Sequence, residues 1–200
     1  MNDVFKTITA PSEGVYKEKG SRFMAFAFPV STEEQIRKIL DGLKDKYYDA
    51  RHHCYAWQLG AEGTVFRAND DGEPSSTAGK PILGQIRSNG LTDILIVVVR
   101  YFGGIKLGVP GLINAYREAA SAALSNAVVK EKTLDAVFRI RFDYLEMNSV
   151  MRIIKEETPD IVERSFDSEC EMLLSIRQKN MPRLRARLEK VKSLSFPDEK

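Results

Sequence analysis

The segment from Arg100 to Gly111 carries residue types that could bind phosphate. It contains two cations, Arg100 and Lys106, among four glycines, Gly103, Gly104, Gly108 and Gly111. A glycine-rich loop leading from a buried strand into a helix can point several backbone N–H groups at one anion, and the helix dipole favours the negative charge. The segment matches neither a Walker A loop nor GxGxxG, so it specifies no nucleotide. Glycines also permit tight turns and close packing, and this structural interpretation stays open.

Neighbouring residues could extend such a site toward RNA. Tyr101 or Phe102 offers a ring face on which an unpaired base can stack. Lys80 and Arg117 could add positive charge for phosphate groups. We therefore expect these side chains to join the glycine-rich segment in contacting RNA or phosphate.

Both histidines of the chain and one of its two cysteines lie within residues 51–57. Such a cluster could hold a metal ion or pair a thiol with an imidazole. In a strand, neighbouring side chains point to opposite faces, which groups His52 with Cys54 and separates His53 from both. No CxxC or HxxxH supplies further ligands, so we expect no metal. A buried structural role is favoured for Cys54.

A polar loop at residues 69–79 is the third candidate. Long polar loops on a rigid scaffold often bind ligands, which makes candidates of Asp71, Glu73, Ser75 and Thr77. With Asp70, the loop has enough carboxylates for a divalent cation, although the spacing is not that of an EF-hand. The alternative is an ordinary loop in which a Ser or Thr caps the next helix.

An enzyme is the main alternative to a binding protein. His52, Cys54, Asp71 or Glu73 could serve as base or nucleophile in a hydrolase or transferase. Such a role requires the loop carboxylates to come within hydrogen-bond reach of His52 or Cys54. The residues favour a non-catalytic protein without a cofactor, and they leave the question of catalysis open.

The apolar pattern predicts the elements that position these segments. An unbroken apolar run marks residues 91–100 as a central strand, covered on both faces. A capping box beginning at Ser31 predicts a helix start, and Pro81 suits the first turn of a short helix. In order, we expect a hairpin over 15–30 with a turn at 19–21, a helix after residue 31, strands at 52–59 and 63–68, a helix from about residue 81, the central strand, and a helix over 112–128.

Beyond residue 130 the pattern restarts as a separate domain. The order strand, helix, strand, strand, helix is that of a ferredoxin-like unit, and it places a boundary near residue 131, with domains at 1–130 and 131–200. The last helix carries Arg183, Arg187 and Lys190 on one face, which is either a solvated face or a contact for RNA or protein. The predicted elements are 134–144, 146–157, 161–167, 170–178 and 182–191, with a short strand near 194–196.

Composition limits the class of protein. The 200 residues are 43% hydrophobic and 29% charged, with a net charge of +2. These values are typical of a globular chain and exclude a disordered or collagen-like one. Near-neutral charge argues against strong nonspecific binding of nucleic acid, so any basic site must be local.

Three features bear on location. Two cysteines far apart in the sequence are typical of a reducing compartment. The N-terminus lacks the apolar region of a signal peptide. The longest apolar run, residues 94–99, is far shorter than the roughly 20 residues that span a bilayer. We expect a cytoplasmic protein without membrane contact, and the sequence predicts no oligomeric state.

Four blocks together resemble a known family. They are Lys19–Phe23, Arg51–Ala56, Asp71–Leu83 and Val98–Gly108, and they are similar to the motifs of the Impact family, including its bacterial YigZ-type proteins. The resemblance implies an α+β fold of two domains. The first would be a βαβ sandwich like the second domain of ribosomal protein S-five, with its left-handed crossover. The second would be ferredoxin-like, similar to the fifth domain of elongation factor G.

The resemblance also implies a function. It points to regulation of translation, with RNA or the ribosome as the partner of the bacterial branch, no assigned reaction, and a translation-related protein partner or adaptor role as the alternative. The sequence departs from the family's usual residues at His53, Ser76, Val99, Pro110 and Asn114. The family's motif residues fall here on His52, Cys54, Asp71, Gly72, Glu73, Pro74, Ser75, Thr77, Gly79, Arg100, Tyr101, Gly103, Gly104, Lys106, Leu107, Gly108, Gly111 and Tyr116.

Overall fold

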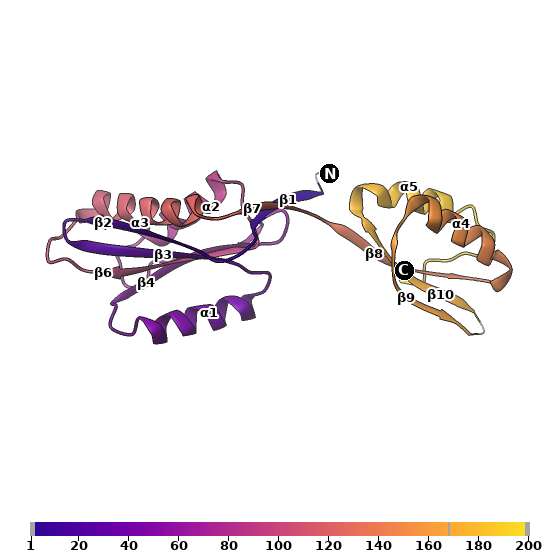
Figure 1. The fold of residues 1–200 in the computed structure, drawn as a ribbon, viewed down its shortest axis with the longest axis horizontal. Coiled ribbons are helices and arrows are strands. Elements are labelled where there is room, and N and C mark those ends of the chain that lie inside the picture. Colours follow the sequence, from indigo (N-terminus) through magenta and orange to yellow (C-terminus); the bar gives the residue numbers. More distant parts are fainter. Residues whose placement is uncertain (1–2, 168, 199–200) are drawn as a thin grey trace. The chain divides into compact units, whose positions relative to one another are not determined.

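The computed structural model describes residues 3–167 and 169–198. These residues form two compact units, one of residues 5–132 and one of residues 133–198 with the short segment 3–4 (Figure 1). Each unit is a β-sheet packed against helices, so the predicted α+β class is confirmed.

The unit of residues 5–132 is built on a five-stranded sheet in which every neighbouring pair of strands is antiparallel. Figure 1 shows α1 on one face of this sheet and α2 with α3 on the other. Helices α1 and α2 each connect two parallel strands that lie on either side of a third strand. In sheet order the strands are β2 (Ser12–Glu18), β3 (Ser21–Pro29), β6 (Ile94–Tyr101), β4 (His52–Leu59) and β5 (Val65–Asn69), and the helices are α1 (Glu33–Lys46), α2 (Gly79–Ser88) and α3 (Gly108–Ser125).

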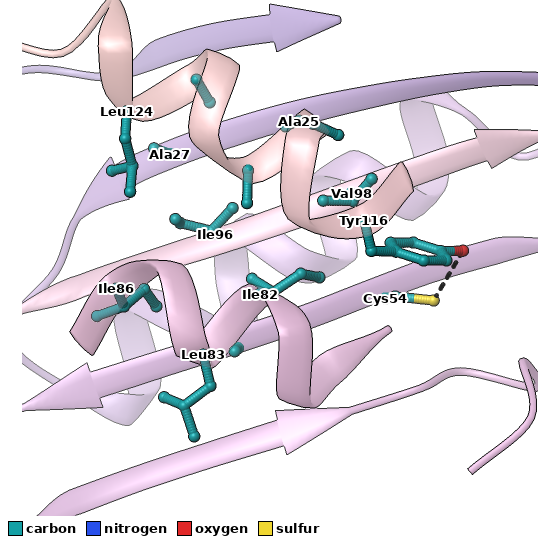
Figure 2. Close-up of a cluster of buried hydrophobic side chains, with 14 of the residues drawn as sticks. Ala25, Ala27, Cys54, Ile82, Leu83, Ile86, Ile96, Val98, Tyr116 and Leu124 are labelled. Atoms are coloured by element: carbon teal, nitrogen blue, oxygen red, sulfur yellow. Dashed lines mark hydrogen bonds between the residues drawn. The ribbon is translucent and has the colours of Figure 1, made fainter. Parts of the chain in front are cut away.

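The central strand β6 divides the core of this unit into two layers. Ile96 and Val98 pack toward α2 and α3, while Leu95, Val97 and Val99 pack toward α1. All of these side chains are buried, as the unbroken apolar run predicts. Small residues of α3 (Ala115, Ala119, Ala120 and Ala123) let it lie close to the sheet, and Figure 2 shows Tyr116 and Leu124 of this helix in the same core cluster.

Of two local predictions, the hairpin is confirmed and the capping box shifts by one residue. The β2–β3 hairpin forms as predicted, with positive φ at Lys19 and Gly20 in its turn. Helix α1 is capped by Thr32 instead of Ser31, because the Thr32 hydroxyl accepts from the Gln35 N–H at 3.3 Å. The Gln35 side chain in turn accepts from the Ser31 N–H at 2.8 Å, so the capping box begins one residue later.

The sequence did not predict the strands β1 (Val4–Ile8) and β7 (Val129–Thr133), which form a two-stranded sheet. β7 has exposed side chains throughout, so it lacks the apolar alternation that marks a half-buried strand. Helix α3 also differs from its prediction, because it begins at Gly108 and ends at Ser125. The glycine-rich segment therefore supplies the first turn of this helix.

The second unit has a three-stranded antiparallel sheet in the order β8, β10, β9. An isolated bridge between Arg141 and Ser195 extends it beyond β8, where the short last strand was expected. This is the strand order of a ferredoxin-like fold. The elements are β8 (Asp135–Phe142), η1 (Tyr144–Glu146), α4 (Met147–Glu157), β9 (Asp160–Phe166), β10 (Cys170–Arg177), η2 (Gln178–Asn180) and α5 (Met181–Leu188). Within the described residues, no helix is both long and apolar enough to span a membrane.

Candidate anion-binding pocket

A pocket of about 450 Å³ opens at the start of α3. The end of β6 and the loop after it form one side, and the start of β4 with the loop after β5 forms the other. The neighbouring strands β4 and β6 bring these segments together, because His52 pairs with Arg100 across them. The lining combines polar residues (Arg51, His52, Glu73, Arg100, Lys106, Gly108) with apolar ones (Pro74, Phe102, Leu107, Val109, Leu112).

Asp70 organises the polar loop. Its carboxylate accepts hydrogen bonds from the N–H groups of Ser76, Ala78 and Gly79, at 2.8, 3.0 and 2.8 Å. Ala78 is the N-cap of α2 and makes no capping bond of its own. The helix start is therefore capped by an aspartate eight residues upstream, where the sequence suggested a Ser or Thr.

Asp71 holds the two histidines in different ways. Its carbonyl oxygen lies 2.8 Å from His52 Nδ1, and its carboxylate accepts from the His53 backbone N–H at 2.6 Å. Because a carbonyl can only accept, His52 Nδ1 donates this hydrogen bond. Burial lowers the pKa of His53, although the nearby Asp71 carboxylate opposes that change. His53 is therefore a neutral, buried residue.

A chain of hydrogen bonds runs from the pocket into the core. Glu73 Oε1 accepts from Arg100 at 2.5 Å and from the Tyr116 hydroxyl at 2.7 Å. The Cys54 thiol donates to the Tyr116 hydroxyl at 3.3 Å, the contact drawn in Figure 2, and lies 3.0 Å from the Asp70 carbonyl. Burial raises the pKa of both the Cys54 thiol and the Tyr116 hydroxyl. Both groups are thus protonated, and the Tyr116 hydroxyl is the one that donates to Glu73.

The Arg100 guanidinium is fixed on several sides and still has an unused donor. It lies between the rings of Phe23 and Phe102, at 5.3 and 5.6 Å from their centres, and its side chain is 8% exposed. Among the residues that the structure describes, its buried Nε has no hydrogen-bond partner. A buried donor without a partner is costly, so the site is suited to an acceptor from a ligand.

The first turn of α3 faces the same pocket. Its N-cap, Leu107, makes no side-chain capping bond, and Leu107, Gly108 and Val109 all line the cavity. The backbone N–H groups of a helix start have no partner within the helix and carry partial positive charge. Together with Lys106 and Arg51, they make the pocket electropositive on one side and apolar on the other.

The sequence-predicted site residues divide between this pocket and other places. His52, Glu73, Arg100, Lys106 and Gly108 line it. Gly111 lies in the first turn of α3. Asp71 is adjacent to it through its bond to His52.

Several expected contributors lie elsewhere. Tyr101 points to the α1 face, where its hydroxyl donates to Asp49 at 2.7 Å and this bond raises the pKa of Tyr101 to about 12. Alternation along the strand explains this, because residues 100 and 102 share a face and residue 101 does not. Thr77 is buried and donates to the Pro74 carbonyl. Ser75, Lys80 and Arg117 are exposed and do not line the pocket.

Two of the glycines have a structural role in the backbone, one through close packing and one through its φ angle. A Cβ on Gly103 would lie 1.9 Å from the carbonyl carbon of Gly20, so Gly103 permits the loop to pack on the β2–β3 turn. Gly104 has a φ of +90°, which disfavours other residues, and nothing packs against it. For these two positions the structural interpretation of the glycine-rich segment holds.

Sequence reasoning did not single out Arg51, Leu107 or Val109 as pocket residues. Arg51 lies just before β4 and is exposed, and its place at the start of the block 51–56 was the signal that could have found it. Leu107 and Val109 could be recognised as pocket residues only when the structure showed that α3 begins at Gly108. A correct helix start would have been the signal for these two.

Among the described residues, the hydrogen bond that the enzyme alternative requires is not formed, although His52 and Glu73 line the same pocket. The carboxylates of Asp71 and Glu73 bond to the His53 backbone and to Arg100 with Tyr116, and neither bonds to the His52 ring or the Cys54 thiol. Cys54 is buried, and burial disfavours its thiolate. Within residues 3–167 and 169–198, no group of three or more His, Cys, Asp or Glu side chains is placed to hold a metal ion.

Comparison with known proteins identifies the family of the chain and shows that the pocket lies in the family's domain. The model of the Impact N-terminal domain matches residues 19–124, which include every residue that lines the pocket. The Impact family member YvyE of Bacillus subtilis is 35% identical over 179 residues, covering 90% of this chain and 82% of its own length. The chain belongs to the Impact family.

Further relatives extend the Impact likeness over both units. The Impact family member YigZ of Escherichia coli is 32% identical over 161 residues, covering 80% of this chain and 79% of its own length. A crystal structure described as a hypothetical protein matches with a TM-score of 0.75 and 27% identity, over 100% of both chains. The predicted family is therefore confirmed.

Proposed function

We propose that this Impact protein is a non-catalytic regulator of translation that associates with RNA or the ribosome, and that the pocket at the start of α3 binds an RNA phosphate. The observation that carries the proposal is the buried Arg100 Nε, a donor without a partner among the described residues, beside an uncapped helix start. A phosphate oxygen is the acceptor that both features favour.

The size and lining of the pocket favour one nucleotide of an unpaired strand. A volume of about 450 Å³ is in the range of small-ligand sites and far too small for a duplex. Phe102 lies beside the cations and offers a ring for a base, and single-stranded RNA is commonly bound by stacking with phosphate contacts. The exposed Arg51 and Lys106 can reach the same phosphate.

The link to translation rests on the family. Membership in the Impact family supports a role in translation control, and RNA of the ribosome or bound to it is the partner that fits a phosphate pocket. The near-neutral net charge of +2 agrees with a local contact in place of a general affinity for nucleic acid.

A protein-interaction adaptor is the second candidate, and one observation favours it. Phe102 and Val109, which line the pocket, are 55% and 51% exposed, and Ile105 of the same segment is 57% exposed. Exposed apolar side chains beside a cavity are typical of protein contacts. Binding of this kind would depend weakly on salt, because it does not release counterions from phosphates.

Co-sedimentation with ribosomes over a series of salt concentrations tests the proposal. Wild type should pellet at low salt and release steeply as salt rises, and Arg51→Ala/Lys106→Ala should release at lower salt. Both replaced side chains are exposed, so the fold should be unaffected. The matched control is Lys80→Ala/Arg117→Ala, which removes the same charge outside the pocket and should behave as wild type.

Three results would contradict the proposal. They are no pelleting of wild type at low salt, equal release of the pocket and control variants, and pelleting that is insensitive to salt. The last result would favour the adaptor.

A further inference from the structure

A second cavity, about 420 Å³ in volume, lies between α4 and α5 in the unit of residues 133–198. The two helical segments that contribute its lining, residues 144–157 and 181–192, contain seven basic and four acidic side chains although the chain as a whole is near neutral. Positive charge is therefore in excess on the helical face of this unit. This cavity, called the α4–α5 groove below, is lined by Glu146, Ser149, Arg152, Ile153, Arg187, Lys190, Val191 and Lys192.

The basic residues here fall into two groups. Arg183 and Arg187 pair with Glu157, which is almost fully buried, and Arg187 also reaches Glu156. These arginines join the end of α4 to α5 and are engaged in the fold. This finding answers the open question about the basic face of the last helix for two of its three residues.

The other group is available to a ligand. Arg152, Lys190 and Lys192 are exposed, line the groove and have no carboxylate within 4.0 Å among the described residues. Glu156 attracts Arg152 and Glu146 also lines the cavity, but the three cations outnumber these carboxylates and create a positive potential that favours one phosphate or two adjacent ones.

On the opposite face of the same unit, the arginines that the structure describes are paired with carboxylates. Arg139 and Arg141 lie on the open face of the sheet, where each is paired with carboxylates: Glu163, Glu171 and Asp198 for Arg139, and Glu169 and Glu171 for Arg141. A polyanion approaching this sheet would have to displace those carboxylates. The groove between the helices is therefore the better surface for a polyanion.

The lining of the groove also distinguishes RNA from an acidic protein. Its two aliphatic residues, Ile153 and Val191, are only 7% and 8% exposed, so they give a protein side chain little to pack against. Protein interfaces depend on buried aromatic or aliphatic anchors, whereas contacts to an RNA backbone depend on exposed cations.

We infer that the α4–α5 groove is a second phosphate site, which holds the backbone of RNA by Arg152, Lys190 and Lys192. The choice of RNA as the polyanion rests on the proposed function, whereas the groove and its charges do not. The site adds affinity without sequence preference, because it contacts only backbone phosphates.

Binding of a fluorescein-labelled twelve-residue oligouridylate by the full chain, followed by anisotropy over a range of salt, tests this inference. For single strands the slope of log Kobs against log salt changes by about 0.7 for each phosphate that the protein no longer neutralises, so Lys190→Gln/Lys192→Gln should flatten it by about 1.4. Lys155→Gln/Lys179→Gln removes equal charge from exposed positions outside the groove and should leave the slope unchanged. Thermal unfolding of each variant checks that the fold is retained.

The outcomes separate this inference from the proposed function. Equal slopes for the groove and control variants overturn the groove site alone. A flatter slope for Lys190→Gln/Lys192→Gln with an unchanged slope for Arg51→Ala/Lys106→Ala supports the groove site and contradicts phosphate binding in the pocket. Absence of RNA binding by wild type at low salt contradicts both. Displacement of the RNA by polyglutamate at matched charge concentration, with no change in slope for the groove variant, would favour an acidic protein instead.

Discussion

Each unit contains an arginine–glutamate ion pair, which is buried in the first unit and partly exposed in the second. In the first, Arg100 and Glu73 meet at 2.5 Å with side chains only 8% and 4% exposed. In the second, Arg139 and Glu171 meet at 2.7 Å with side chains 30% and 28% exposed, inside a network of alternative partners. Among the described residues, the buried Arg100 has one carboxylate partner, whereas the exposed Arg139 has three.

This difference bears on where a ligand can bind. Tyr116 and two aromatic rings hold the buried pair, so the guanidinium presents its free Nε in a fixed direction. Donors fixed in advance lose little entropy when a ligand arrives. The exposed network neutralises its own arginines, so the groove site that we infer in the second unit relies on the exposed cations of the helical face, Arg152, Lys190 and Lys192.

The largest effect on stability is expected from breaking the buried pair. Glu73→Gln leaves the Arg100 charge buried without a counter-charge, which should lower the free energy of unfolding by about 3–5 kcal/mol. Urea denaturation measures this. Glu171→Gln, the matched change in the exposed network, should have no measurable effect. Equal losses in the two variants would remove the distinction between the units.

A smaller effect is expected at the turn that supports the pocket. In Gly103→Ala the new Cβ meets the backbone of Gly20, and such overpacking should cost about 1–3 kcal/mol. Gly84→Ala is the control, because a Cβ at this position in α2 meets nothing within 4 Å and alanine favours a helix. Thermal unfolding should show a lower Tm for the first and an unchanged or higher Tm for the second. An undisturbed Gly103→Ala protein would show that the loop does not depend on this close packing.

The smallest of the three effects concerns pH. His53 is buried and its pKa lies below the ordinary 6.5, so the unfolded chain binds the proton more readily than the folded one. Stability should therefore fall as pH drops below about 6.5, and the loss should level off below the folded pKa of His53. Urea denaturation between pH 5 and 8 should give a flatter profile for His53→Gln than for wild type. Parallel profiles for the two proteins would contradict this assignment.

Much of the fold was accessible from the sequence because its elements carry strong local signals. The unbroken run of residues 94–99 predicts a covered central strand, and the turn at Lys19 and Gly20 predicts the hairpin. The prediction of helix starts was less accurate, because a side chain distant in sequence can cap a helix, as Asp70 does for α2. The exposed strand β7 has no periodic signal at all.

The site was predicted in outline only. Arg100, Lys106 and Glu73 were found by type and spacing, but the sequence could not show that Arg100 and Glu73 neutralise each other. Strand alternation could have excluded Tyr101 in favour of Phe102 once the strand was known to continue to residue 101. Lys80 and Arg117 could be placed outside the pocket only from the folded chain.

The central claim is that the first turn of α3 and Arg100 bind phosphate together. A titration of ¹⁵N-labelled protein with uridine 5′-monophosphate, followed by two-dimensional NMR, tests it most directly, with uridine as the control without phosphate. We predict saturable shifts in the backbone amides of Gly108 and Val109 and in the Arg100 Nε–H, which Arg51→Ala/Lys106→Ala weakens. Unchanged resonances at these three groups, or equal shifts with uridine, would contradict the account.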